Sequence, residues 1–403
     1  MSDAVIVATA RSPIGRAFKG SLTELRGDDM AAQIVKAVLG KVPQLDPGLV
    51  EDLLMGCGQP GGEQGFNVGR VVAVLSGLGH VPGVTVNRYC SSSLQTIRMA
   101  AHAIKAGEGD VFVAAGVEAV SRFGKGMSDS IPDTQNPIFE EAGKRTAERS
   151  LGGAPAWAPP PGLPDIYIAM GQTAENVREH EKVSRQEMDE FAALSQQRAV
   201  ASQHNGFFER EITPLTLPGG AVVGTDDGPR EGTTVEKLAQ LKPAFRPDGE
   251  VTAGNSCPLN DGAAAVVVMS DAKARELGVK PLARVVASGV SALNPEIMGL
   301  GPIEASRQAL KRAGMTIDDV DLVEINEAFA AQVVPSARHL GVDWDKLNVN
   351  GGAIALGHPF GMTGARIMTT LLNGLEDRNK TIGLETMCVG GGQGMAMIVE
   401  RLS

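Results

Sequence analysis

Short apolar runs alternate with polar, turn-rich segments along the chain, a pattern that predicts strands and helices in regular alternation. In the first part, the predicted elements cover residues 4–8 (strand), 30–39 (helix), 50–57 (strand), 94–106 (helix) and 110–115 (strand). The same order returns at 283–290 (strand), 304–313 (helix), 319–325 (strand), a helix after the glycine-rich run from 348, and 381–387 (strand). Gly40 and Gly314 follow the first helix of each set, where glycine commonly ends a helix. We therefore expect an α/β protein of two similar halves, each a mostly parallel sheet covered by helices.

A region of different character lies between the two halves. Residues 122–166 are predicted to be irregular, with a proline-rich piece at 154–161. Two helices follow at 170–181 and 184–205, and Ser184 with Glu187 has the pattern of a capping box. The stretch 218–232 is polar and turn-rich. A long insertion of this kind is usually a lid or a binding region, and the alternative is a solvated decoration.

A strand predicted at 262–269 is expected to return the chain to the first half. The expected division is therefore 1–121 with 248–274 as the first half, 122–247 as the insertion and 275–403 as the second half.

Composition excludes some classes of function. The 403 residues are 43% hydrophobic and 21% charged, which is ordinary for a globular protein. A formal net charge of −10 and only 4% aromatic residues argue against nucleic-acid binding. The chain passes from Met1 into an apolar strand without a predicted signal peptide or membrane span, so we expect a cytoplasmic protein that binds no membrane.

Four widely spaced cysteines, with no Cys-x-x-Cys pair, predict neither a metal site nor a disulfide framework; they are Cys57, Cys90, Cys257 and Cys388. Cys90 precedes three serines and a predicted helix. The free N–H groups and dipole of a helix start favour negative charge, so we expect a lowered thiol pKa and a reactive thiolate at Cys90. The alternative is that Cys90 is a small buried hydrophobic residue.

Three more segments carry candidate chemistry. His358 lies in a glycine-rich run that takes the place of the Cys90 segment in the second half, so the two residues are expected to meet at one central site. Cys388 ends a strand before the glycine turn 390–392, whose N–H groups suit an anion. Asn326 ends another strand and is suited to donate to an oxyanion. The alternatives are a histidine bonded to a loop carbonyl, a buried strand-end cysteine and a helix N-cap.

Together these segments resemble the thiolase family over essentially the whole chain; they are 87–95 around Cys90, 326–330, 351–364 around His358, and 388–392. The resemblance implies a five-layered α-β-α-β-α fold of two mixed βαβαβαββ halves, with residues 122–247 as a loop domain over a coenzyme A site. It implies the reversible cleavage of a 3-ketoacyl-CoA by CoA, or the reverse Claisen condensation. CoA and its acyl thioesters are then substrates, no cofactor is bound permanently, and family members are homodimers or homotetramers.

By the same resemblance, Cys90 is the nucleophile that carries the acyl group, His358 activates it, and Cys388 is the acid/base at the α-carbon of acetyl-CoA. Asn326, through a water, and His358 form one oxyanion hole, and the N–H groups of Cys90 and Gly390 form the other. The residue chemistry agrees, because carbon–carbon cleavage beside a ketone needs an acyl acceptor and a separate proton donor.

The resemblance also supplies candidate CoA contacts. Arg230 matches a contact near the adenine or phosphate end, and could equally be a solvated surface charge. The other candidates are Leu241, Ala244, Phe245 and Ala253 along the pantetheine, with Met170 and Phe329 at the acyl-end channel. Cys257 stands where many members have a serine that contacts CoA.

Further departures from the family pattern bear on the acyl group. Ala169 stands where short-chain biosynthetic members usually have histidine, and Phe360 and Met362 stand where aliphatic and small residues are common. These favour a degradative 3-ketoacyl-CoA thiolase over an acetoacetyl-CoA-specific acetyltransferase. Less favoured hypotheses are a ketoacyl synthase, a non-catalytic acyl-CoA carrier of the same fold, and a thiol redox sensor.

Overall fold

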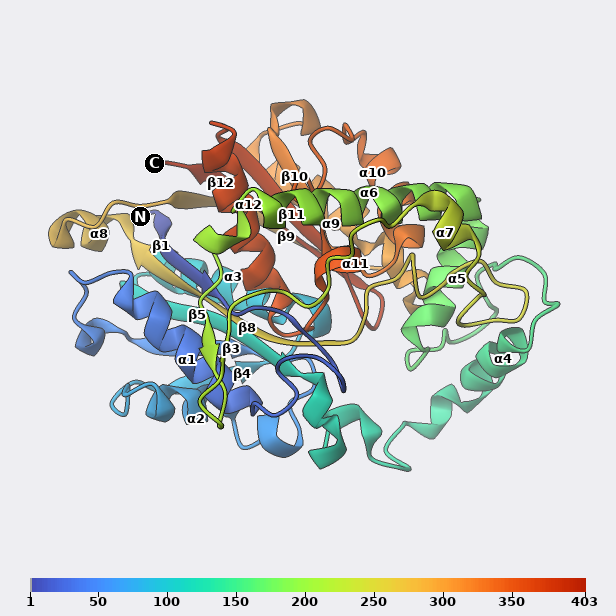
Figure 1. Ribbon diagram of the computed structural model, residues 1–403, viewed down its shortest axis with the longest axis horizontal. Helices are drawn as coiled ribbons and strands as arrows, with labels where there is room; N and C mark the ends of the chain where they lie inside the picture. The colour runs from blue at the N-terminus through green and yellow to red at the C-terminus, as the bar shows by residue number, and fades with distance from the viewer. Residues whose placement is uncertain (1) are drawn as a thin grey trace.

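Two halves of the same topology build the protein, as seen in the computed structural model, which describes residues 2–403 (Figure 1). The strands of the first half are, in sheet order, β4 (Gly83–Val86), β3 (Asp52–Gly56), β5 (Val111–Ala119), β8 (Asn260–Ser270) and β1 (Ala4–Arg11). Those of the second half are β10 (Leu322–Ile325), β11 (Ile382–Val389), β12 (Gln393–Arg401) and β9 (Ala283–Ala292). A parallel bridge from Val323 to Leu347 stands where β4 lies in the first half. The predicted repeat is confirmed.

The sheets are mixed. The pairs β4–β3, β3–β5 and β10–β11 are parallel, whereas β5–β8, β8–β1, β11–β12 and β12–β9 are antiparallel. The prediction of mostly parallel sheets is therefore wrong, and the mixed pattern implied by the family resemblance is confirmed. Edge strands β1 and β9 pair at Val5–Arg284 and Ile6–Ala283, which joins the halves into one ten-stranded sheet that also includes β2 (Gly15–Arg16).

Helices cover the outer faces and fill the centre. The outer helices are α1 (Gly27–Gly40), α2 (Val68–Leu75), α8 (Asp271–Leu277), α9 (Gly301–Ala313) and α10 (Ala330–Leu340). The central pair are α3 (Ser92–Ala106) and α12 (Thr363–Asp377), which pack on each other between the two halves of the ten-stranded sheet. A short helix, α11 (Ala353–Leu356), precedes α12. Outer helices, the strands of one half, the central helices, the strands of the other half and further outer helices form the five layers expected. Three buried apolar clusters follow from this arrangement, one in each outer interface and one around the central helices.

The central helices start in close contact. The hydroxyl of Ser93 on α3 accepts the N–H of Ala365 on α12 at 2.9 Å. A Cβ added to Gly364 would lie 2.3 Å from the backbone nitrogen of Leu94, so a larger residue there would force the helices apart. The loops that precede these helices, which carry Cys90 and His358, are therefore held against one another.

The insertion contains more helix than its sequence predicts. Helices α5 (Met170–Glu181) and α6 (Arg185–His204) match the predictions, and the capping box of Ser184 and Glu187 is present. Residues 122–166 were expected to be irregular, yet α4 (Glu140–Ser150) lies there and extends away from the body (Figure 1). The remaining elements are α7 (Val235–Ala239) and the hairpin β6 (Leu215–Thr216) and β7 (Val222–Val223).

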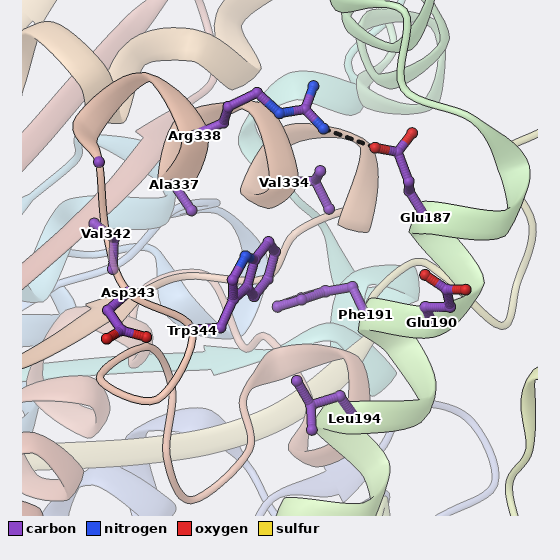
Figure 2. A pocket seen from close by; sticks show the side chains of 11 residues that line it. Glu187, Glu190, Phe191, Leu194, Val334, Ala337, Arg338, Val342, Asp343 and Trp344 are labelled. Carbon is purple, nitrogen blue, oxygen red and sulfur yellow. Dashed lines mark hydrogen bonds and ion pairs between the residues drawn. The ribbon is translucent and has the colours of Figure 1, made fainter.

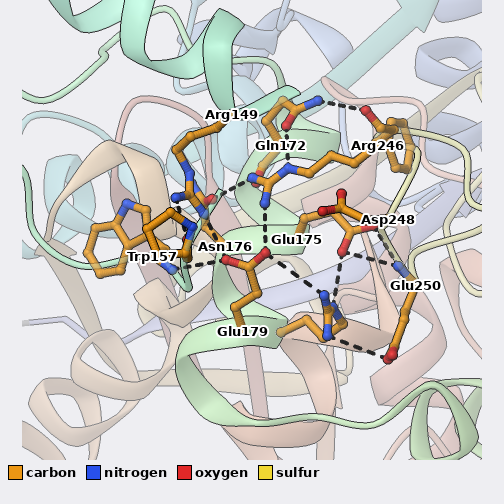
Figure 3. A network of polar contacts seen from close by, with 12 residues as sticks. Arg149, Trp157, Gln172, Glu175, Asn176, Glu179, Arg246, Asp248 and Glu250 are labelled. Carbon is orange, nitrogen blue, oxygen red and sulfur yellow. Dashed lines mark hydrogen bonds and ion pairs between the residues drawn. The ribbon is translucent and has the colours of Figure 1, made fainter. Parts of the chain in front are cut away.

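A polar network fixes the proline-rich segment to α5 (Figure 3). The buried guanidinium of Arg246 donates to Gln172, Asn176 and Glu179 of α5 at 2.6–3.2 Å. Glu179 also accepts the N–H of Trp157 at 2.9 Å. These contacts hold α5, whose first residue is Met170, at a fixed position beside the central loops. None of the helices within residues 2–403 combines the length and apolar character needed to cross a bilayer.

Candidate active site

Cys90 lies in a 3₁₀ turn, Tyr89–Ser91, that runs directly into α3, so it occupies the predicted junction. Tyr89 has φ +41°, a left-handed conformation that is uncommon outside glycine. The turn is held by the Tyr89 N–H, which donates to Asn87 Oδ1 at 2.8 Å. The N–H groups of Cys90 itself and of Gly390 face the Cys90 sulfur. Gly390 comes from the second half, so the sulfur is placed where the two halves meet.

Cys90 opens onto a cavity of about 640 Å³, a volume typical of small-molecule sites. The residues that line it are Gln59, Tyr89, Cys90, Ser128, Asp129, Thr134, Gln135, Ile166, Tyr167, Ile168, Met170, Phe360, Gly390, Gly391 and Gln393. Met170 and Phe360, which the sequence associates with the acyl group, are both in its wall. The other predicted reactive groups, His358, Cys388 and Asn326, are fully buried and do not line this cavity.

His358 precedes α12 and is held at both ring nitrogens. Its Nδ1 lies 2.6 Å from the Thr363 hydroxyl, which itself donates to Pro359 O at 2.8 Å. Because that hydroxyl has one hydrogen, Nδ1 must be the donor to it, and Nε2 is left as an acceptor. Nε2 accepts from Asn326 Nδ2 at 3.3 Å. The network therefore selects the tautomer whose Nε2 can take a proton.

Asn326 follows β10, as predicted, and touches His358 directly rather than serving as an isolated helix cap. Its backbone N–H donates to Thr386 O at 3.0 Å, and its carbonyl accepts Gln332 Nε2 at 2.6 Å, which fixes the residue. Its side-chain Oδ1 has no partner within residues 2–403. A buried amide oxygen without a partner is suited to hold a water.

Cys388 is the penultimate residue of β11, pairs with Gly394 of β12 and is fully buried. The turn that follows has Gly391 at φ +80° and Gly392 at φ +79°. A Cβ at Gly392 would lie 2.3 Å from Leu293 O, so only glycine fits the turn that presents the Gly390 N–H. Burial raises the pKa of the Cys388 thiol, and Cys90 and Cys257 lie close enough to raise it further.

The expected lowering of the Cys90 pKa is wrong. Burial raises the pKa of the Cys90 thiol to about 11, although the N–H groups of Gly390 and Cys90 oppose the shift. The effect of lost solvation on the Cys90 pKa therefore outweighs that of the N–H groups at the helix start. Burial also raises the pKa of Cys388 and of Cys257 well above the ordinary thiol value. Cys90 is a neutral thiol near pH 7 and needs a base.

His358 is suited to be that base. Burial, with a smaller effect from the Arg366 guanidinium, lowers its pKa to about 3, so the imidazole is neutral near pH 7. Within residues 2–403, Cys90 makes no hydrogen bond to His358. Catalytic contacts are often long before substrate binds, and proton transfer requires a closer approach or a bridging water.

The candidate CoA contacts lie mainly on the insertion and the segment after it. Leu241, Ala244, Ala253 and Arg230 are exposed. The backbone N–H of Arg230 donates to Gln196 of α6 at 2.9 Å. Both roles considered for its side chain, a phosphate contact or a solvated charge, stay open.

Phe245 and Phe329 pack edge to face, with ring centroids 5.9 Å apart. Cys257 is joined to the Asn326 loop, since its N–H donates to Ala328 O at 3.0 Å.

Three supporting residues were not predicted from the sequence. Thr363 bonds the His358 ring, and Asn260 Oδ1 accepts the His358 N–H at 3.1 Å. The buried Glu118 of β5 accepts the N–H groups of Gly58 at 2.7 Å and of Gly361 at 2.9 Å, and so joins the loop after β3 to the His358 loop. Each depends on contacts distant in sequence, which no local pattern reveals.

A second hollow of about 660 Å³ lies between α6 and α10 and contains none of the predicted site residues (Figure 2). Trp344 and Phe191 pack together in it with ring centroids 5.7 Å apart. Arg338 and Glu187 form an ion pair at its edge at 2.7 Å. It offers no nucleophile, so Cys90 and its surroundings stay the candidate site.

Comparisons with known proteins find related sequences over essentially the whole chain. Residues 4–272 match the family model "Thiolase, N-terminal domain" and residues 279–401 match "Thiolase, C-terminal domain". The chain is 43% identical to a 3-ketoacyl-CoA thiolase of Aeromonas hydrophila and 43% identical to a beta-ketoadipyl-CoA thiolase of Acinetobacter baylyi, each over 100% of both chains.

Among solved structures, the acetyl-CoA acetyltransferase of Bacillus anthracis matches with a TM-score of 0.86 and 38% identity, covering 100% of this chain and 99% of that one. The repeated halves, the loops that precede the two central helices and the full-length similarity all lead to one assignment: the chain belongs to the thiolase family.

Proposed function

We propose that the protein catalyses the reversible, CoA-dependent cleavage of a 3-ketoacyl-CoA to acetyl-CoA and a shortened acyl-CoA, through an acyl-enzyme on Cys90. The observation that carries the proposal is that Cys90 of the first half lies close enough to Cys388 of the second half to raise the pKa of its thiol, while the Cys90 and His358 loops precede two helices in direct contact. The names of the full-length relatives support the same reaction.

In the first half-reaction, the Cys90 sulfur attacks the C3 ketone while its proton passes to His358 Nε2. The C2–C3 bond then breaks, which leaves the acyl group on Cys90 as a thioester. The departing acetyl-CoA enolate takes a proton from the Cys388 thiol. Two separate thiols are needed because the one that holds the acyl group has no proton left to give.

In the second half-reaction, CoA gives its thiol proton to the Cys388 thiolate and attacks the Cys90 thioester. Acyl-CoA leaves, and the Cys90 sulfur recovers its proton from His358. Every proton is thereby returned, and both thiols end neutral. Their raised pKa values favour this resting state.

Two oxyanion sites accompany these steps in the proposal. The N–H groups of Cys90 and Gly390 hold the former ketone oxygen, which is attached to the carbon bonded to the Cys90 sulfur. Once His358 is protonated, its Nε2–H and a water on Asn326 hold the oxygen of the acetyl-CoA enolate. The unpartnered Asn326 Oδ1 supports such a water.

We also propose the binding role of the insertion. Residues 122–247 act as the loop domain over the CoA site, between the halves formed by 1–121 with 248–274 and by 275–403. Arg230, Leu241, Ala244 and Ala253 then hold CoA from the exposed side, with Phe245 and Phe329 near the reacting end. The exposed side chain of Arg230 suits a phosphate, because a guanidinium is always charged.

The test of the reaction is loss of the enolate absorbance when purified protein and CoA are mixed with 3-ketoacyl-CoA substrates of increasing chain length. Cleavage that extends beyond acetoacetyl-CoA supports the degradative hypothesis, and cleavage of acetoacetyl-CoA alone supports the acetyltransferase hypothesis. No cleavage of any member of the series would refute the proposal.

Variants test the separate roles proposed for the Cys90 and Cys388 thiols. Cys90→Ala should abolish the acyl-enzyme seen by intact mass spectrometry. Cys388→Ala should still acquire an acetyl group from acetyl-CoA but fail to condense it. Normal turnover by Cys388→Ala would show that its acid/base role is wrong.

We infer that the protein forms a homodimer or homotetramer. Large apolar side chains are exposed, including Phe66 at 93% and Leu151 at 78%, and such groups mark association surfaces where they gather. Light scattering after gel filtration tests this, and a monomer at micromolar concentration would contradict it.

A further inference from the structure

The cavity beside Cys90 has a wall of mixed apolar and polar side chains with a single negative charge. Among its lining residues, Asp129 is the one ionisable carboxyl group, and no lysine, arginine or histidine is present in that set. Its volume of about 640 Å³ leaves room for more than the acetoacetyl group. A substrate whose acyl chain fills this cavity therefore meets a carboxylate with no facing cation.

Asp129 is held in place by the loop after β3. Gln59 Nε2 donates to Asp129 Oδ2 at 2.7 Å, and the N–H of Asp129 donates to Gln59 Oε1 at 3.1 Å. The single hydroxyl hydrogen of Ser128 is shared between Gln59 Oε1 at 2.9 Å and Asp129 Oδ1 at 3.1 Å. Gln59 is itself buried, and its N–H donates to Glu118 at 3.2 Å. The carboxylate is thus an exposed charge whose position at the cavity wall is set by these hydrogen bonds.

Asp129 also faces the turn that carries the nucleophile. Burial, together with the charge of Asp129 and a hydrogen bond to it, raises the pKa of the Tyr89 hydroxyl to about 12. Tyr89 therefore remains neutral and adds no second negative charge to the wall. Arg88 lies behind the wall, where its Nη1 donates to Gln393 Oε1 at 2.8 Å and its Nε donates to Gln95 Oε1 at 3.2 Å. Gln393 stands between this guanidinium and the cavity.

We propose that this pocket accepts uncharged acyl groups larger than acetoacetyl and that Asp129 discriminates against acyl chains that end in a carboxylate. The proposal rests on the proposed thiolase reaction and adds its substrate class. This substrate preference distinguishes the chain from its relative named beta-ketoadipyl-CoA thiolase, because the beta-ketoadipyl group of that name ends in a carboxylate. The physical cause is like-charge repulsion between the Asp129 carboxylate and the terminal carboxylate of the acyl chain, which water and salt partly screen because Asp129 is exposed.

The test compares 3-ketohexanoyl-CoA with 3-ketoadipyl-CoA, which have the same number of acyl carbons and differ in the terminal carboxylate. For the wild-type protein we expect the charge of Asp129 to make kcat/KM favour the uncharged substrate by about two- to fivefold. Asp129→Asn keeps the shape and removes the charge, and should narrow this ratio by about two- to fivefold by raising kcat/KM for 3-ketoadipyl-CoA alone. Raising the salt concentration should narrow the wild-type ratio as well, because Asp129 is solvent-accessible.

Asp133→Asn is the matched control. Asp133 is an exposed aspartate on the same segment, lies outside the cavity wall, and has φ +59°, which asparagine tolerates. It should leave the substrate ratio unchanged. If the wild type cleaves 3-ketohexanoyl-CoA but neither Asp129→Asn nor salt alters the ratio, the inference is overturned while the proposed reaction stands. If neither substrate is cleaved, both are overturned.

Discussion

Replacing Glu118 by glutamine should damage the site although Glu118 touches none of the proposed reacting atoms. Its carboxylate is fully buried and accepts four N–H hydrogen bonds. Oε2 accepts the N–H groups of Gly58 at 2.7 Å and Gly361 at 2.9 Å, whereas Oε1 accepts Gln64 Nε2 at 2.9 Å and the N–H of Gln59 at 3.2 Å. Gly361 belongs to the His358 loop and Gly58 to the other half, so one side chain sets their separation.

The expected loss of stability follows from the number of N–H donors that Glu118→Gln leaves without an acceptor. Glutamine has one carbonyl oxygen, which serves two of the four N–H groups, and its NH₂ faces the other two. Each buried donor left without an acceptor costs about 1–3 kcal/mol, or about 2–6 kcal/mol for two. Burial raises the pKa of Glu118, so removing its charge recovers part of this cost. We expect the free energy of unfolding to fall by about 2–4 kcal/mol.

Activity should fall by more than stability alone explains, since displacement of a catalytic loop by about 1 Å costs roughly a hundredfold. The measurements are the urea midpoint and kcat for the preferred 3-ketoacyl-CoA. Asp321→Asn is the control, because Asp321 accepts the N–H groups of Thr381 and Ile382 at 2.9 Å at the far end of β10. It should lose stability without a comparable loss of kcat. Wild-type kcat in folded Glu118→Gln would rule out the positioning role.

Three further predictions concern the site and the insertion. Because burial raises the Cys90 pKa to about 11, its alkylation rate by iodoacetamide should rise about tenfold per pH unit through pH 9, and a plateau near pH 7 would contradict this. Thr363→Val removes the acceptor of the His358 Nδ1–H and should lower kcat roughly tenfold with little change in KM, whereas Thr363→Ser keeps the hydroxyl and should retain kcat. Equal activity of the two variants would be inconsistent with a role of Thr363 in orienting His358. Arg246→Met removes four hydrogen bonds, three of them buried, at a cost of about 3–5 kcal/mol, and should speed proteolysis within 140–165; unchanged cleavage would argue against the network in Figure 3.

Much of the repeat was predictable because several of its strands are buried on both faces. All residues of β5 and β8 are buried, so they appear in the sequence as continuous apolar runs. The helix α4 was missed because Ala142 is its single buried residue, and a solvated helix has no apolar periodicity to detect. The mixed strand directions could not be predicted from these runs, since a buried strand looks alike in either direction.

The loops that carry the candidate residues were predictable from the sequence, but the electrostatics of those residues were not. Cys90 and His358 precede matching helices of the two halves, and the repeat alone indicates that they meet. The reasoning from the helix start failed for the Cys90 pKa because it omitted burial, which depends on Gly390 and on other residues far away in the sequence. Long-range burial is a property of the assembled fold, and it reversed the direction of the shift.

In the proposed mechanism the two halves depend on each other for reactivity. A thiolate stabilised by its own helix would be reactive without a partner, whereas a neutral Cys90 with a pKa of about 11 depends in that mechanism on His358 from the other half. The low pKa of His358 means that its imidazolium is costly and is favoured when a developing negative charge lies beside it. Proton transfer should therefore be coupled to substrate binding rather than precede it. The free protein is then protected from unwanted alkylation and oxidation, because the reactive ion pair forms only when a carbonyl occupies the N–H groups of Cys90 and Gly390.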